Sequence, residues 1–331
     1  MAAKHSKPSG NKSASQQKSS ASAGQATPAP RPWEQISVDL RHRDPAFPNV
    51  PLPWLLRALA LTFFAVAACS WLLFCFLFWQ GSWQLLYHPL RTAPATPSSR
   101  NIPWQSIHFD ASETGVTQLT AWWIPADNTI PHAAILVLHG SDGNLADTLP
   151  LDAWLHAQHQ NVFAIDYRGY GQSASGKPSE AQLVHDATRA VRWLADTKHI
   201  PHGAIVLWGV GLGAEIAAQL AADSSDIGGV VLQNPLDHPL DSILNDPRSR
   251  LVPAHLLLRD HYDLAADAAH IAVPSLWLLP DSSPRPAAFH LAPASKTALW
   301  LKMPLEEDPH SSAALTRWLD ELPQFAAAPT H

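Results

Sequence analysis

The sequence predicts an α/β protein with a mostly parallel β-sheet, preceded by a single transmembrane helix. From residue 104 to residue 322, short apolar runs alternate with helix-like stretches, which is typical of a sheet covered by helices on both faces. Before them, residues 58–79 form a run of 22 residues without a charged side chain. A chain of 331 residues has room for one large domain of this class and appendages.

The apolar run is long enough to cross a bilayer, because a rise of about 1.5 Å per residue carries it across a hydrocarbon core of about 30 Å. Trp54 and Trp83 flank the run, as aromatic side chains do at membrane interfaces. The preceding segment is too long for a cleaved signal peptide, and no small-x-small cleavage site follows the run. A buried core helix would carry more polar positions than Thr62 and Ser70.

We therefore expect a disordered basic tail and linker over residues 1–52, a transmembrane helix over residues 53–80 and an α/β-domain over residues 81–331. The tail consists largely of Ser, Ala, Lys, Gln and Pro and cannot bury enough surface to become ordered. Arginines precede the apolar run closely, whereas those that follow it are fewer and farther away. This asymmetry predicts a cytoplasmic N-terminus, a domain on the outer (periplasmic or extracytoplasmic) side, and the lipid bilayer as a partner.

The two ends of the chain carry opposite charge. Residues 1–57 contain eight basic and three acidic residues, a net charge of +5, and the remainder contains 14 basic and 25 acidic residues, a net charge of −11. A domain this acidic repels phosphate backbones, so nucleic-acid binding is not expected. Both cysteines, Cys69 and Cys75, lie in the apolar run, which excludes a cysteine nucleophile or disulfide from the domain. The histidines form only close pairs such as His156 and His159, so no metal or cofactor is expected.

The expected strands share short aliphatic or β-branched runs, at residues 104–109, 118–124, 133–138, 161–166, 204–208, 228–233, 275–279 and 298–302. The expected helices cover residues 146–158, 179–197, 211–222 and 311–322. Ser179 and Glu180 should supply a cap and a favourable charge at the start of the second helix. No insertion that would form a large lid is recognised between Gln233 and Ser275.

Four segments occur in an order and at a spacing that resemble the α/β-hydrolase superfamily, specifically its membrane-anchored, serine-aminopeptidase-like branch. They are LVLHGSDGN (136–144), AIDYRGYGQSASGKPSE (164–180), LWGVGLGAEIA (207–217) and the late DPH (308–310). The resemblance covers residues 85 to 322, and DYRGYG is its most specific motif. It implies the α/β-hydrolase fold, with ligands bound beyond the carboxyl ends of the parallel strands.

The resemblance assigns a role to the motif that ends the strand at residues 133–138. His139, Gly140 and Ser141 occupy the position of the oxyanion-hole loop. The backbone N–H of Ser141 would be one oxyanion donor and that of Leu212 the other. Gly140 would let the backbone approach a ligand closely.

The most informative departure from the family lies in the strand-to-helix turn at residues 209–213. Family members carry G-x-S-x-G there, with the serine on a strained turn. This chain keeps the flanking glycines Gly209 and Gly213 but has Gly211 at the nucleophile position. No backbone group can replace a serine hydroxyl in forming an acyl-enzyme, whereas glycine tolerates the turn's unfavourable φ.

The acid position of the resembled triad also departs from the pattern. The family register P-x-L-x-x-x-G-x-x-D, laid on Pro274, places Pro280 at the usual glycine and Ser283 at the aspartate. Asp281, two residues earlier, would serve if the loop were shorter. His310 follows the last strand and precedes the closing helix, where the family carries its base.

These departures leave three hypotheses. The first is a pseudoenzyme with a degenerate catalytic triad that binds a small acyl or peptide-like ligand or acts as a scaffold at the membrane. The second is an active esterase- or peptidase-type hydrolase that uses His310 with an unrecognised nucleophile or with directly activated water. The third is a membrane protein whose domain keeps its fold without any ligand.

Overall fold

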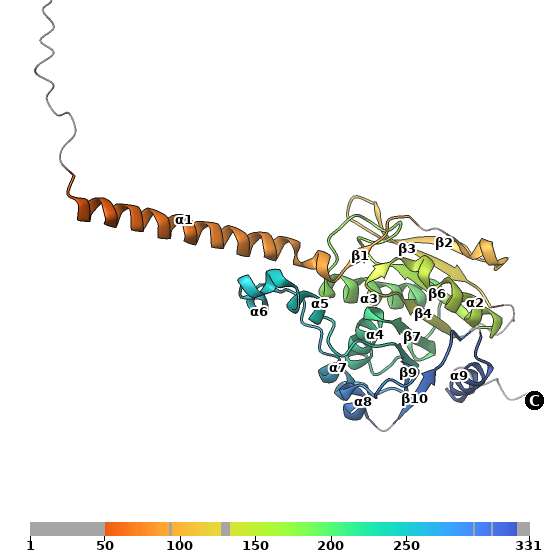
Figure 1. Ribbon diagram of the computed structural model, residues 1–331. Helices are drawn as coiled ribbons and strands as arrows, with labels where there is room; N and C mark the ends of the chain where they lie inside the picture. Colours follow the sequence, from red (N-terminus) through yellow and green to blue (C-terminus); the bar gives the residue numbers. More distant parts are fainter. Residues whose placement is uncertain (1–49, 93–94, 127–132, 294, 306, 323–331) are drawn as a thin grey trace, which may run out of the picture. The chain divides into compact units, whose positions relative to one another are not determined.

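The computed structural model describes residues 50–92, 95–126, 133–293, 295–305 and 307–322 (Figure 1). The chain divides into two compact units, residues 1–63 and residues 64–331. The described residues of the first unit lie mainly in the beginning of helix α1 (Leu52–Gly81). The rest of α1 belongs to the second unit. The tail expected to be disordered lies outside the described residues up to position 49.

Helix α1 is apolar on all sides. Together with the following turn (Ser82–Leu85) it covers Leu52–Leu85, and an 18-residue window within it has a mean hydropathy of 2.3, so by length and composition it can cross a membrane. Its sequence shows no amphipathic face that a soluble helix would need.

The second unit is built on an eight-stranded sheet with the order β10-β9-β8-β7-β4-β6-β3-β2. The strands are β2 (Gln105–Ala111), β3 (Thr117–Ile124), β4 (Ala134–Leu138), β6 (Asn161–Asp166), β7 (Ile205–Val210), β8 (Gly229–Gln233), β9 (Ser275–Pro280) and β10 (Lys296–Leu301). From β6 to β10 all neighbours are parallel, whereas β2 and β3 form an antiparallel hairpin, and β3 runs antiparallel to β6. The structure confirms the predicted mostly parallel sheet.

Helices cover both faces of this sheet (Figure 1). On one face lie α3 (Glu180–Thr197), α4 (Leu212–Asp223), α7 (Leu264–His270) and α8 (Ala287–Leu291), and on the other lie α2 (Leu149–Ala157) and α9 (Pro309–Glu321). Strand β4 shows why two cores form: Leu136 and Leu138 point into one core, while Ile135 and Val137 point into the other. Its five residues are all buried, as expected for a central parallel strand.

Three local features differ from the sequence expectations. The helix expected from residue 146 begins as a 3-10 turn (Leu145–Thr148), and α2 starts only at Leu149. The expected cap from Ser179 is not made, because its side chain accepts no hydrogen bond at the start of α3. The Glu180 carboxylate instead accepts from the His261 N–H (2.6 Å), which ties the start of α3 to a distant loop.

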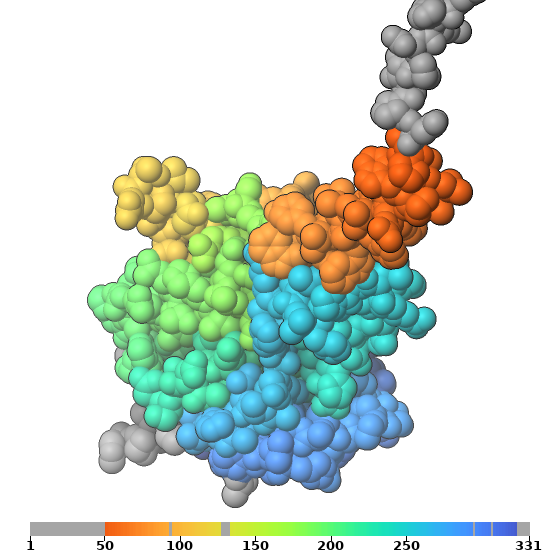
Figure 2. Space-filling view, turned by 90° about the vertical axis from the view of Figure 1, so that its left-hand side faces the viewer, coloured from red at the N-terminus to blue at the C-terminus, as the bar shows by residue number. Residues whose placement is uncertain are grey.

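The chain between β8 and β9 folds into short helices that sequence patterning did not identify. They are α5 (Asp241–Leu244), a 3-10 turn (Pro247–Leu251), α6 (Ala254–Leu257) and α7. This segment, drawn in cyan, forms a continuous part of the surface in Figure 2. A two-stranded bridge between β1 (His88–Pro89) and β5 (Asp142–Gly143) was also missed.

Candidate active site

The turn between β7 and α4 has the backbone shape that a nucleophile elbow requires. Gly211 links Val210 to Leu212 with φ 57° and ψ −120°, a conformation that L-residues adopt only at a cost. Its N–H donates to the Gln233 carbonyl oxygen (2.9 Å), and its own carbonyl accepts from the Ala214 N–H (3.0 Å). A Cβ added to Gly211 would meet no atom closer than the Gly140 Cα at 3.9 Å, so the turn has room for a side chain.

The glycines on either side of Gly211 are sterically required. A Cβ on Gly209 would overlap the backbone of Gly213, and a Cβ on Gly213 would overlap the carbonyl oxygen of Leu138. Helix α4 therefore begins in direct backbone contact with the end of β4, which carries the neighbouring loop.

The loop after β4 presents the second half of the predicted oxyanion site. Within the described part of the chain, the backbone N–H of Ser141 donates to no acceptor. The backbone N–H of Leu212 also lacks an acceptor there, because Leu212 is the first residue of α4 and the first N–H groups of a helix have no partner inside the helix. The Ser141 carbonyl oxygen accepts from the His88 N–H (2.9 Å) and the Tyr170 hydroxyl (2.8 Å). These bonds hold the loop in place, and β1 extends it by pairing with β5.

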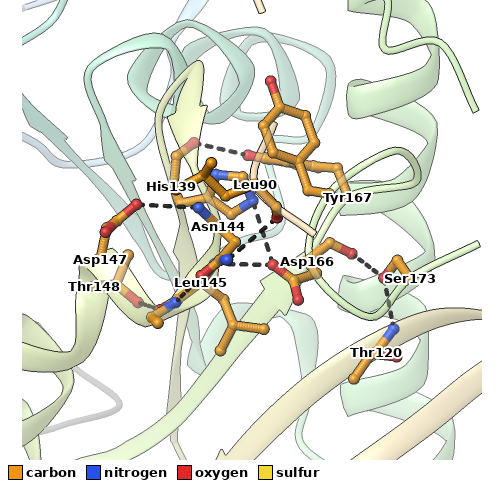
Figure 3. Close-up of polar contacts among 12 residues, drawn as sticks. Leu90, Thr120, His139, Asn144, Leu145, Asp147, Thr148, Asp166, Tyr167 and Ser173 are labelled. Carbon is orange, nitrogen blue, oxygen red and sulfur yellow. Dashed lines mark hydrogen bonds and ion pairs between the residues drawn. The ribbon is translucent and has the colours of Figure 1, made fainter. Parts of the chain in front are cut away.

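His139 lies beneath this loop as a buried, neutral side chain (Figure 3). Its Nδ1 donates to the Gly140 carbonyl oxygen (2.8 Å), and its ring packs between Tyr167 and Tyr170 at centroid distances of 4.6 and 4.8 Å. Burial lowers the pKa of His139 to about 4, so the imidazole is uncharged at neutral pH. Its Nε2 lies 3.9 Å from Asp166 Oδ1.

Asp166, at the end of β6, accepts hydrogen bonds from two backbone N–H groups near this loop (Figure 3). Its Oδ1 accepts from the Leu145 N–H (2.8 Å), and its Oδ2 accepts from the Gln172 N–H (3.2 Å). Burial raises the pKa of Asp166 to about 6, although both backbone donors favour the ionised form. The two side chains act as supports for the loop.

The nearby DYRGYG turn is held by a charged pair. Arg168 donates from its backbone N–H (2.8 Å) and its Nε (2.7 Å) to the carboxylate of Asp186, which is fully buried in α3. The pair ties this turn to α3.

A mostly apolar cavity opens beside the elbow, with an empty volume of about 630 Å3 that includes space open to solvent. Its lining comes from the strand ends, from α2 and from the loop before α9, and includes Gly140, Val210, Gln233, Leu151, Trp154 and Leu305. Val210, the residue before Gly211, thus faces an apolar space. The loop that ends at His310 contributes one wall of it.

The predicted acid and base positions lie outside this cavity lining. His310 is exposed in the first turn of α9, where its N–H donates to Asp308 Oδ1 (3.1 Å). The Ser283 hydroxyl donates to the Pro280 carbonyl oxygen (2.7 Å) within its own turn. Asp281 is exposed and has no polar partner among the described residues. Across the described ranges no hydrogen bond or ion pair joins His310 to Asp281 or Ser283.

Asp308 caps α9 and is the carboxylate next to His310 in the structure. Its Oδ1 and Oδ2 accept from the N–H and hydroxyl of Ser311 at 3.1 and 2.7 Å. The hydrogen bonds from Ser311, and then the neighbouring His310, lower the pKa of Asp308. Among the residues that the structure describes, no group of three His, Cys, Asp or Glu side chains is arranged to hold a metal ion.

Glu215 is a buried acid near the elbow that the motif analysis passed over. It lies one turn into α4, is 1% exposed, and its Oε1 accepts from the Leu236 N–H (3.1 Å) after β8. Burial, reinforced by the nearby carboxylates of Asp267 and Asp237, raises the pKa of Glu215 to about 9. The available signal was a single charge inside the otherwise apolar run LGAEIAAQLAA.

The crowding around the two glycines predicts unequal effects of adding a methyl group. Gly211→Ala should cost about 1–3 kcal/mol, because only the positive φ opposes it. Gly213→Ala should cost more, because its Cβ overlaps the Leu138 carbonyl oxygen. Thermal unfolding of the full chain in detergent measures both variants, and a milder effect of Gly213→Ala would contradict the close backbone approach.

The raised pKa of Glu215 predicts a component of stability that falls as pH rises. Below the ordinary pKa of 4.5 the carboxyl is protonated in both states, and between 4.5 and about 9 only the folded state keeps the proton. The side chain of Glu215→Gln is neutral at every pH. The unfolding temperature of this variant should therefore exceed that of the wild type by an amount that grows from roughly pH 5 to roughly pH 9. A constant difference across that range would show that Glu215 is ionised in the folded protein.

Comparison with known proteins agrees with this architecture. The family model for the alpha/beta hydrolase fold matches residues 133–321. The chain is 36% identical over 141 residues to the uncharacterized protein YfhR of Escherichia coli O157:H7, covering 40% of this chain and 48% of YfhR. It is 30% identical over 165 residues to the alpha/beta hydrolase domain-containing protein WAV2 of Arabidopsis thaliana, covering 48% and 53%. The chain thus matches about half the length of these relatives.

A solved structure supports the fold alone. The Pyrococcus furiosus esterase Pf2001 superimposes with a TM-score of 0.55 at 18% identity, over 72% of this chain and 98% of that chain. The sheet order, the elbow between β7 and α4 and the family-model match all lead to the same assignment. The chain belongs to the α/β-hydrolase fold family.

Proposed function

We propose that this domain is a pseudoenzyme that binds an acyl or peptide-like ligand without forming an acyl-enzyme. The observation that carries the proposal is Gly211, which holds the elbow conformation of φ 57° and ψ −120° and has no side chain to attack a substrate. An acyl-enzyme needs a nucleophilic side chain at this point, and glycine offers none.

The ligand chemistry follows from what surrounds the elbow. The N–H groups of Ser141 and Leu212 are donors without an acceptor in the described chain, and they suit a carbonyl or carboxylate oxygen. The cavity lined by their neighbours Gly140 and Val210 has apolar walls, formed by side chains such as Leu151, Trp154 and Leu305. A ligand with one oxygen-bearing end and one apolar end would use both features.

The hypothesis of a hydrolase that uses His310 gains no support from the arrangement of side chains. His310 is exposed, is absent from the cavity lining, and its recorded neighbours are Asp308 and Ser311 in its own turn. A water-activating base needs hydrogen-bond reach to the reacting centre, directly or through one water.

We further propose that α1 anchors the domain in a membrane with the N-terminus in the cytoplasm and the domain on the outer side. The length and mean hydropathy of the helix support the span. The arginines before the helix support the orientation.

A gain-of-function experiment tests the missing nucleophile. The full chain should show no turnover of short-chain p-nitrophenyl esters and no labelling by a fluorophosphonate. Gly211→Ser has room for its Cβ, so this variant, alone or with Ser283→Asp, should gain labelling at position 211 but little turnover, because His310 lies outside the cavity lining. Wild-type turnover that His310→Ala abolishes would overturn the pseudoenzyme proposal.

A binding experiment separates a ligand-binding role from a purely structural one. Octanoate, which has a carboxylate and an apolar chain, should raise the unfolding temperature of the wild-type chain. Leu151→Glu places a charge in the cavity wall and should remove most of that shift, whereas Leu291→Glu alters an exposed leucine of α8 and should not. No shift with the wild type, or an equal shift with both variants, would contradict binding of such ligands in the cavity.

A further inference from the structure

The segment between β8 and β9 exposes leucines that the domain leaves uncovered. Leu256 in α6 is 83% exposed and Leu251 at the end of the preceding 3-10 turn is 64% exposed, with the exposed Pro253 between them. Single exposed leucines are ordinary on a protein surface, but several within a few residues indicate a contact.

These leucines lie beside the second half of α1. The Trp71 indole N–H donates to the Leu251 carbonyl oxygen (2.9 Å), and the Arg259 guanidinium lies 3.9 Å from the centroid of the Trp79 ring. Cys75 and Phe78, between those two tryptophans, are buried against the domain. The last turns of α1 therefore dock on the domain, and Leu251 lies level with Trp71.

The length of α1 places a membrane surface at that level. From Trp71 to the end of the helix at Gly81 the rise is about 15 Å. One side of these turns packs on the domain through Cys75 and Phe78, and the other side, with Leu72 and Leu77, remains exposed. The preceding part, residues 52–70, rises about 28 Å, close to a hydrocarbon core of about 30 Å. This span lies nearer the N-terminus than the uncharged run 58–79, and it requires the long side chain of Arg57 to reach the far interface. If α1 crosses a bilayer with that part, the interface falls beside Leu251.

The charge of the segment fits the same surface. Residues 247–259 contain three arginines and no acidic residue, although the chain after residue 57 carries a net charge of −11. Arg248 is bound by Asp246 (2.8 Å), whereas Arg250 is exposed and has no partner in the described part of the chain. Exposed leucines between arginines are a pattern that suits an anionic lipid surface.

We propose that residues 247–259 form a second membrane contact, in which Leu251 and Leu256 enter the leaflet that α1 leaves and Arg250 binds the phosphate groups of anionic lipids. This inference rests on the proposed anchoring by α1. The segment follows Gln233, which lines the cavity, so it leaves the sheet at the same edge as the elbow. Such a contact holds that edge close to the bilayer, from which an acyl ligand can be supplied.

A depth measurement on the full chain tests this contact. The chain is placed in vesicles of phosphatidylcholine with 30% phosphatidylglycerol, a composition chosen to be roughly as anionic as membranes that recruit basic segments. Cys69→Ala and Cys75→Ala remove the native thiols, and Leu256→Cys carries a single NBD label. Leu291→Cys, at a leucine of α8 that is 54% exposed, is the matched control.

The label at position 256 should emit at shorter wavelength than the label at position 291. Doxyl-labelled lipids should quench it several-fold more strongly, and aqueous iodide should quench it less. Arg250→Glu should weaken the lipid quenching in these vesicles and have little effect in vesicles of phosphatidylcholine alone, because only the former carry the anionic headgroups.

Extraction with alkaline carbonate separates the two proposals. If the protein remains in the vesicles while the label at 256 behaves like that at 291, the anchoring stands and the second contact is wrong. If carbonate releases the protein, both are overturned. A label at 256 that is shielded from iodide but not quenched by doxyl lipids shows that protein, such as a second copy of this chain, covers the leucines instead, and this also overturns the proposal.

Discussion

The close approach of two backbones at the carboxyl edge of the sheet governs the geometry of the site. Helix α4 starts against the end of β4, with Gly213 in contact with the Leu138 carbonyl and Gly209 in contact with Gly213, so that neither position has space for a Cβ. This contact sets the distance between the elbow and the loop at residues 139–141. One residue of each segment, Val210 before the elbow and Gly140 in the loop, lines the neighbouring cavity. Only glycines permit this contact.

The loop that faces the elbow is supported by two buried titratable groups, of which His139 is uncharged at neutral pH and Asp166 is mostly ionised. His139 has its pKa lowered to about 4 and Asp166 has its pKa raised to about 6, in both cases chiefly by burial. Two backbone N–H groups compensate the Asp166 carboxylate, whereas His139 Nε2 has no hydrogen-bond partner among the described residues. The loop depends on the hydrogen bonds of Asp166 to Leu145 and Gln172 and on the packing of the His139 ring between two tyrosines.

Gly211 separates two properties that one residue combines in an active serine hydrolase. A serine at an elbow supplies the nucleophile and tolerates a strained φ, and glycine meets the backbone requirement without the strain. The turn is also fixed from outside, since Gly211 N–H is bound by Gln233 and the nearby Glu215 binds Leu236 beyond the same strand. The loss of a side chain at position 211 therefore leaves the surrounding structure intact, which is consistent with a binding role for the cavity.

The sequence by itself determined the elements that depend on local patterns. Continuous apolar runs identified the parallel strands, since such strands are buried on both faces, and the long uncharged run identified α1. The resemblance to the α/β-hydrolase superfamily located the elbow at 209–213 and the loop at 139–141. Tertiary structure decided the rest. The short helices α5 to α8 lack enough turns to show a period, and Glu215 is buried only because α4 packs under the segment after β8. The relation of His310 to Asp281 and Ser283 depends on loop conformations, which side-chain packing between distant segments sets and which no local pattern records.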